Sequence, residues 1–149
     1  MKIEIVSTVP ASRDDTWAAV MDIPKAASCI PGISEVTFDS EGRYTATLQA
    51  RVGPMGLTLT GIITVLSRDN ESREAEFLVE ANDRRVGGGV KTNMVMKVTS
   101  KTVDESELEI KSDTTFMGRL GELGQPIIRR KARNTLEDFV KNISNLLAC

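Results

Sequence analysis

Residues 43–65, RYTATLQARVGPMGLTLTGIITV, form two runs of alternating side chains joined by a short turn. From Tyr44 to Val52 every second residue is apolar and the residues between are polar, which is typical of a half-buried antiparallel strand. The same period resumes from Leu57 to Val65, after a turn at 53–56 that contains two glycines and a proline. The stretch therefore predicts a long β-hairpin.

Five further segments have the same period of two. They are residues 2–9, a weaker run at 34–38, and the runs 74–81, 90–98 and 108–116. Together with the hairpin they predict seven strands, each with one apolar face.

Helical signals stand in two places. Pro10 ends the first strand, Ser12 is a candidate N-cap, and Pro24 suits the first turn of a second short helix. We read Asp22, just before this proline, as a turn or cap group. Two short helices are therefore expected between the first and second strands.

From Leu120 to Leu147 the apolar residues recur at spacings of three and four, as one face of a long helix requires. Pro126 cannot lie deep inside that helix, so the helix either begins close to Gln125 or is kinked there. A sheet with one apolar face buries it most economically by curling around this helix. We predict an α+β fold of a single domain over residues 1–149.

The composition excludes several classes of function. With no histidine in the chain, a Ser-His-Asp triad, a His-activated cysteine and an HExxH zinc site are ruled out. Few aromatic residues and a net charge of -2 argue against nucleic-acid binding. No signal peptide or membrane span is present, which indicates a cytoplasmic protein. Cys29 is read as an interior thiol and Cys149 as an exposed one, and no metal or cofactor is expected.

Four motifs carry a resemblance to a known family. They are DIPKAASCIPGI at 22–33, VGPMG at 52–56 followed by Gly61, the triple glycine at 87–89, and FMGRLGELG at 116–124. Over essentially the whole chain the sequence resembles the CoxG-like family, named after the CoxG component of carbon monoxide dehydrogenase. This family is part of the START and birch-pollen-allergen superfamily, and the resemblance implies its helix-grip fold.

The resemblance also implies a function. The family's cavity is thought to accept an apolar molecule such as a quinone, and its members are associated with molybdenum-containing dehydrogenases. Some members carry a C-terminal extension proposed to reach the membrane. This chain stops directly after its long helix, so we expect at most peripheral membrane contact.

The predicted cavity lies between the sheet and the long helix. Its walls are expected to be apolar, with the flexible Met94 and Met96 able to accept several ligand shapes and with two hydroxyls that can orient a carbonyl. The alternatives are an ordinary packed core and hydroxyls bonded to nearby backbone. The candidate binding residues are Tyr44, Leu48, Leu59, Ile63, Phe77, Val79, Met94, Met96, Ile110, Ser112, Thr114, Phe116, Leu123, Ile127, Ile128 and Leu136.

Basic residues gather near the start of the long helix, at Arg129, Arg130, Lys131 and Arg133. Residues 118–149 contain six basic and three acidic side chains, whereas the rest of the chain has a net charge of -5. This asymmetry fits an acidic partner or an anionic lipid surface. The alternative is a solvated helix face whose arginine and lysine side chains pair with Glu137.

Three functions remain open from the sequence. The leading hypothesis is a non-enzymatic protein that binds a small quinone- or lipid-like ligand and assists a molybdenum hydroxylase. The second is a cyclase, hydrolase or dehydratase, which would need a carboxylate on an inward strand position. The third is an assembly module that uses the basic helix and leaves the cavity empty. The oligomeric state is not predicted.

Overall fold

The computed structural model describes residues 1–148, so Cys149, expected as an exposed thiol, lies outside the described residues. Within residues 1–148, seven strands and three α-helices follow in the predicted order, with one additional 3₁₀ turn, η1, before the last helix. The elements are β1 (Lys2–Val9), α1 (Arg13–Met21), α2 (Ile23–Ala27), β2 (Ile33–Ser40), β3 (Arg43–Val52), β4 (Met55–Asp69), β5 (Glu74–Asp83), β6 (Gly88–Thr102), β7 (Glu105–Gly118), η1 (Arg119–Glu122) and α3 (Gln125–Leu147).

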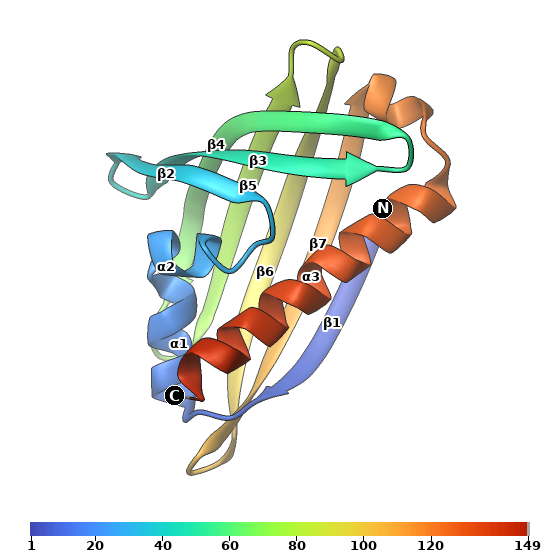
Figure 1. The fold of residues 1–149 in the computed structure, drawn as a ribbon. Helices are drawn as coiled ribbons and strands as arrows, with labels where there is room; N and C mark the ends of the chain where they lie inside the picture. Colours follow the sequence, from blue (N-terminus) through green and yellow to red (C-terminus); the bar gives the residue numbers. More distant parts are fainter. Residues whose placement is uncertain (149) are drawn as a thin grey trace.

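All seven strands belong to one antiparallel sheet in the order β1-β7-β6-β5-β4-β3-β2, with β1 and β2 at its edges. The sheet curls, and α3 runs diagonally across its concave face (Figure 1). The apolar side of each alternating strand thus faces the apolar stripe of the helix. The predicted α+β helix-grip fold, with two short helices after the first strand, is confirmed.

A bend in β4 turns the hairpin of β3 and β4 over the end of the sheet (Figure 1). β4 pairs with β5 only from Asp69 back to Thr60, whereas it pairs with β3 as far as the hairpin turn at Met55. Gly61 lies at the point of separation, where a Cβ atom would be 2.0 Å from the carbonyl oxygen of Glu80. A residue without a side chain is therefore required where the two strands part.

The helix ends follow their predicted signals. The Ser12 hydroxyl accepts the backbone N–H of Asp15 at 3.1 Å, and the Asp22 carboxylate accepts that of Lys25 at 3.4 Å. Both residues are thus N-caps, as expected. α3 begins at Gln125 with Pro126 in its first turn, so the first of the two alternatives for this helix is right. Leu120 belongs to η1 and not to the long helix.

The lower half of the molecule is a closed apolar core. Val98, Leu108, Ile110 and Ile143 are each 0% exposed, packed between the sheet and the C-terminal half of α3. Cys29 is buried in the same core as predicted, and this burial raises the pKa of its thiol. Within residues 1–148, no helix is both long and apolar enough to cross a membrane.

Candidate functional site

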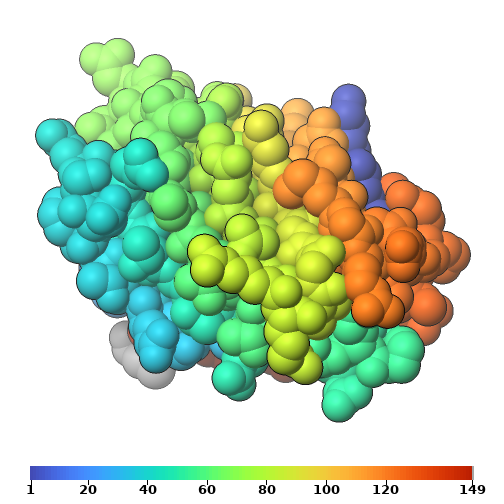
Figure 2. Space-filling view, turned by 90° about the horizontal axis from the view of Figure 1, so that it is seen from above, coloured from blue at the N-terminus to red at the C-terminus, as the bar shows by residue number. Residues whose placement is uncertain are grey.

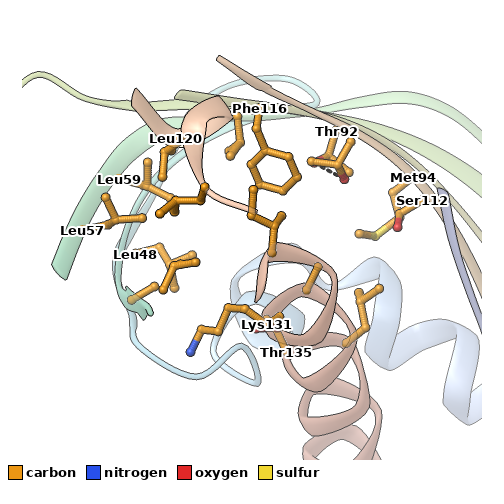
Figure 3. Close-up of a pocket in the computed structure, with 18 residues that line it drawn as sticks. Leu48, Leu57, Leu59, Thr92, Met94, Ser112, Phe116, Leu120, Lys131 and Thr135 are labelled. Atoms are coloured by element: carbon orange, nitrogen blue, oxygen red, sulfur yellow. Dashed lines mark hydrogen bonds between the residues drawn. The ribbon is translucent and has the colours of Figure 1, made fainter. Parts of the chain in front are cut away.

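A cavity of about 200 Å³ lies above this core, between the concave face of the sheet, the β3–β4 hairpin and the N-terminal half of α3 (Figure 3). Most of its wall is aliphatic. The lining residues are Leu48, Ala50, Val52, Leu57, Leu59, Val90, Thr92, Met94, Ser112, Thr114, Phe116, Leu120, Leu123, Ile128, Lys131, Ala132, Thr135 and Leu136.

The pairing of β6 with β7 fixes where the cavity begins and ends. Three successive cross-strand pairs line it: Val90 with Phe116, Thr92 with Thr114, and Met94 with Ser112. The next pair on the same face, Met96 with Ile110, is already part of the closed core. The cavity therefore ends between two adjacent cross-strand pairs of β6 and β7, Met94–Ser112 and Met96–Ile110.

Three segments form the roof above the cavity: the β3–β4 hairpin and η1 line it, and the β5–β6 turn supplies no lining residue but packs against their side chains through Val86. In the view from above, the β5–β6 turn around residue 85 lies between the β3–β4 hairpin and η1 (Figure 2). The Asp83 carboxylate, only 3% exposed, accepts the backbone N–H groups of Thr58, Arg85 and Val86 at 2.8, 2.9 and 3.1 Å. The bonds from Thr58 and Val86 hold the pKa of this carboxyl below its usual range. On the other side, the N–H of residue 119 donates to the carbonyl of Gly87 at 3.1 Å. The turn therefore clamps the bent part of β4 over the cavity.

The polar groups of the wall are few. The Thr92 and Thr114 hydroxyls are 3.0 Å apart, so one of them donates its proton to the other. Ser112 Oγ donates to the carbonyl of Ile3 over 3.5 Å, and Thr135 Oγ1 donates to the carbonyl of Lys131 at 2.8 Å. These bonds already satisfy part of the hydrogen-bonding capacity of each hydroxyl. The wall can therefore orient one oxygen of a guest but is not built to receive a polar molecule.

Lys131 is the single charged side chain among the described lining residues. It is half-buried, and Figure 3 shows its ammonium beside Leu48, on the side of the cavity away from Thr92. Because Lys131 both lines the cavity and remains partly exposed, the cavity opens along the seam between β3 and α3. The hairpin tip closes the end of this seam, since a Cβ on Gly53 would lie 3.5 Å from Cγ2 of Ile127.

Two larger surface hollows have more polar walls. One, of about 550 Å³, lies between β1 and α3 and includes Glu4, Arg133, Glu137 and Lys141. The other, of about 690 Å³, lies mainly over β4 and β5 and includes Thr58, Thr60, Glu80, Asn82 and Arg84. Apolar ligands favour concave apolar walls with a few polar groups, which makes the smaller cavity the candidate site.

Nine of the sixteen predicted binding residues line this cavity. They are Leu48, Leu59, Met94, Ser112, Thr114, Phe116, Leu123, Ile128 and Leu136. The first six come from strands β3, β4, β6 and β7, and the last three come from the segment that leads into α3 and from its first half.

The other seven predicted residues do not line the cavity. Met96 and Ile110 form the next cross-strand pair and belong to the closed core, and Phe77, the partner of Met94 on β5, belongs to the same core. Tyr44 and Ile63 are partly buried against that core, and Val79 is half-buried on β5. Ile127, in the first turn of α3, lies outside the cavity against the hairpin tip at Gly53 and is 43% exposed.

Nine lining residues were not predicted. They are Ala50, Val52, Leu57, Val90, Thr92, Leu120, Lys131, Ala132 and Thr135. The first five share the alternating inward face already recognised for their strands, so the periodicity contained their signal. Lys131 is predicted as part of the basic cluster, facing either an acidic partner, an anionic lipid surface or solvent, and not as a wall residue. The spacing of four from Ile128 to Ala132 and Leu136 indicates that residues next to it lie on the cavity side of α3.

The chemistry available at the wall is limited. Among the described lining residues there is no Asp, Glu or Cys, and across residues 1–148 no cluster of three Cys, Asp or Glu side chains could hold a metal ion. The site therefore offers apolar contact, hydroxyl groups and one ammonium.

The comparisons with known proteins place this geometry in a family. The sequence profile of the carbon monoxide dehydrogenase CoxG family matches residues 7–148, whereas no curated protein matches the chain.

Solved structures share the fold at low sequence identity. A conserved protein from Geobacillus kaustophilus has a TM-score of 0.90 and 20% identity, with 99% of this chain and 95% of that chain covered. The Zhui aromatase/cyclase from a Streptomyces species has a TM-score of 0.72 and 14% identity, with 99% and 93% covered. A START superfamily protein from Mycobacterium smegmatis has a TM-score of 0.70 and 15% identity, with 99% and 97% covered.

Proposed function

The chain belongs to the carbon monoxide dehydrogenase CoxG family, and from this premise we propose that its cavity binds a small hydrophobic molecule, quinone- or lipid-like. We further propose that it serves as an accessory protein to a molybdenum-containing, carbon monoxide dehydrogenase-like oxidoreductase in the cytoplasm. The observation that carries the binding proposal is the cavity itself, an aliphatic hollow at the position where the fold brings sheet and helix together.

The size of the cavity limits what it can enclose. An engineered protein cavity of about 150 Å³ lined by aliphatic and aromatic side chains binds benzene. At about 200 Å³ the present cavity has room for one ring with short substituents, or for a short chain. The tail of a longer lipid or prenylated quinone would have to leave through the seam between β3 and α3.

Binding is better supported than catalysis. A cyclase or hydrolase mechanism needs a general acid or base within hydrogen-bond reach of the reacting group. Lys131 is the one titratable side chain on the described wall, and it lies at the opening and not beside the hydroxyl groups. The likeness to an aromatase/cyclase is a likeness of fold, which many unrelated functions share.

Native mass spectrometry tests the binding proposal. The purified protein is incubated with menadione, a tail-free quinone, and separately with lauric acid, and each complex is measured against the unliganded mass. We expect a complex of one molecule per chain with at least one probe. Absence of both complexes, together with the absence of any molecule in an organic extract of the purified protein, would contradict the proposal.

The accessory role has its own test. The chain is expected to co-purify with the subunits of a molybdenum-containing oxidoreductase from the same organism when they are produced together, and failure to co-purify with any of them would contradict this role. If it co-purifies equally well when the cavity has been filled by substitution, the assembly-module alternative is favoured and ligand carriage is not needed for the association.

A further inference from the structure

The cavity has a charge at one side only, with Lys131 at the seam and the hydroxyl pair of Thr92 and Thr114 on the opposite wall. The position of this charge indicates the class of ligand. The ligand class inferred here rests on the proposed function, because the ligand would occupy the same cavity.

Lys131 has no acidic partner among the described residues. Within residues 1–148, no carboxylate oxygen lies within 4.0 Å of its ammonium, whereas Arg133, two residues further on, is 4.0 Å from Glu137. The methylene stem of Lys131 lies along the apolar wall, and its charged end points to the seam (Figure 3). This is how a lysine covers apolar surface while its ammonium stays in contact with water.

The neighbouring charges on α3 have the same sign. Arg129 and Arg130 directly precede Lys131 on α3, and both are exposed and lie outside the cavity wall; Arg129 points to the other side of the helix, where it donates to the carbonyl of Lys2 on β1 at 3.2 Å. The first turn of the helix, 125–128, contains no acidic side chain. The positive charge at the seam is therefore the Lys131 ammonium itself, which attracts an anionic group and repels a cationic one.

The hydroxyl end of the cavity does not compete for that anion. Thr92 and Thr114 are bonded to each other, so together they keep one hydroxyl proton for a guest. A carboxylate buried there would lose its hydration against a single hydroxyl donor, which is costly. At the seam the same carboxylate keeps water on one side and meets an ammonium on the other.

We propose that the natural ligand is an amphiphilic carboxylate, whose apolar body of one ring or a short chain fills the cavity and whose carboxylate pairs with Lys131 at the seam. The pair is half-buried and charge-assisted. Because hydrogen bonds to charged groups are stronger than neutral ones but partial exposure weakens them, the expected preference is about tenfold in Kd.

Calorimetric titration with a matched pair of probes tests this proposal. The probes are 4-phenylbutyrate and its neutral amide, 4-phenylbutanamide, which share one ring and a short chain. The wild-type protein is expected to bind the carboxylate about tenfold more tightly than the amide. In Lys131→Met, which keeps the apolar stem, we expect the two affinities to agree within about twofold, and Lys131→Arg should retain the preference.

Arg130→Met is the matched control, since Arg130 is the preceding basic residue on α3 and does not line the cavity. This variant should keep the tenfold preference. A wild-type protein that binds the amide as tightly as the carboxylate, or an unchanged preference in Lys131→Met, would overturn the proposal while the cavity remains a binding site. If neither probe binds but menadione does, the proposal again fails and the proposed function stands. If no probe binds at all, both fail.

Discussion

Filling the cavity with a larger side chain should stabilise the protein and abolish ligand binding at the same time. Ala132 lies on the cavity side of α3, and replacing it by leucine adds three carbon atoms without a polar group. A buried carbon contributes about 0.8 kcal/mol, which gives about 2.4 kcal/mol for three. Ordering the leucine side chain costs roughly 0.5–1 kcal/mol, so the net gain is about 1.5 kcal/mol.

Thermal unfolding followed by circular dichroism measures this gain. For a chain of this length, about 1.5 kcal/mol corresponds to a rise in Tm of about 3–6 °C. The same leucine must be displaced or overpacked when a ligand enters. We therefore expect Kd for a bound probe to rise by at least about tenfold, equivalent to about 1.4 kcal/mol.

Ala19→Leu is the control for the sign of the stability change. Ala19 is a helical alanine that is 3% exposed on α1 and, unlike Ala132, does not line the cavity. Overpacking there should destabilise the protein by about 1–3 kcal/mol. If Ala132→Leu destabilises the protein by a similar amount, or leaves the probe affinity unchanged, the cavity is not the open space that the structure describes.

Three other substitutions test the frame around the cavity. Gly61→Ala places a methyl group against the backbone of β5 and should lower the free energy of unfolding in urea by about 3 kcal/mol. Gly56→Ala is the control: no atom lies within 4 Å of its new Cβ, so stability should change by less than about 0.5 kcal/mol. Equal effects would contradict the close approach of β4 and β5 at Gly61. Asp83→Asn should destabilise the protein at neutral pH. Because the pKa of the Asp83 carboxyl is lower in the folded than in the unfolded protein, the extra stability of the wild type is complete above about pH 5 and is lost as the pH falls through and below the ordinary carboxyl pKa. A stability difference that does not change with pH would contradict the role of the Asp83 carboxylate in holding β4 over the cavity. Leu108→Ala should lower the free energy of unfolding by about 3 kcal/mol, and Trp17 fluorescence and circular dichroism should report the same single transition. Two separate transitions would contradict the proposal of a single domain.

Much of the fold followed from periodicity because strands and helices bury one side of a regular repeat. The alternation around Tyr44 assigned the correct face of β3, and the spacing from Ile128 to Leu136 assigned the correct side of α3. The motif resemblance to the CoxG family was confirmed by the match over residues 7–148. These features depend on residues that are close together in the sequence, so they can be predicted from one amino-acid sequence.

The position of the cavity along the strands was not readable in the same way. Met94 and Met96 have the same pattern, yet only Met94 lines the cavity, since the boundary depends on where α1 and the second half of α3 cover the sheet. The bend at Gly61 moves Leu57 and its neighbours over the helix, and this bend depends on contacts with β5. A lysine in a basic cluster is normally expected on the solvent side of a helix, so the position of Lys131 on the cavity wall can be recognised only from the packing of α3 against β3.

Methyl resonances give the most direct test of where a ligand binds. In protein labelled at Leu, Val and Met methyl groups, titration with a bound probe should shift the resonances of Leu48, Leu59 and Met94 in a saturable way. The methyl groups of Val98 and Leu108, fully buried in the core below, should remain unchanged. Saturable shifts confined to these core methyl groups, or shifts at surface positions alone, would contradict a ligand site between the sheet and α3.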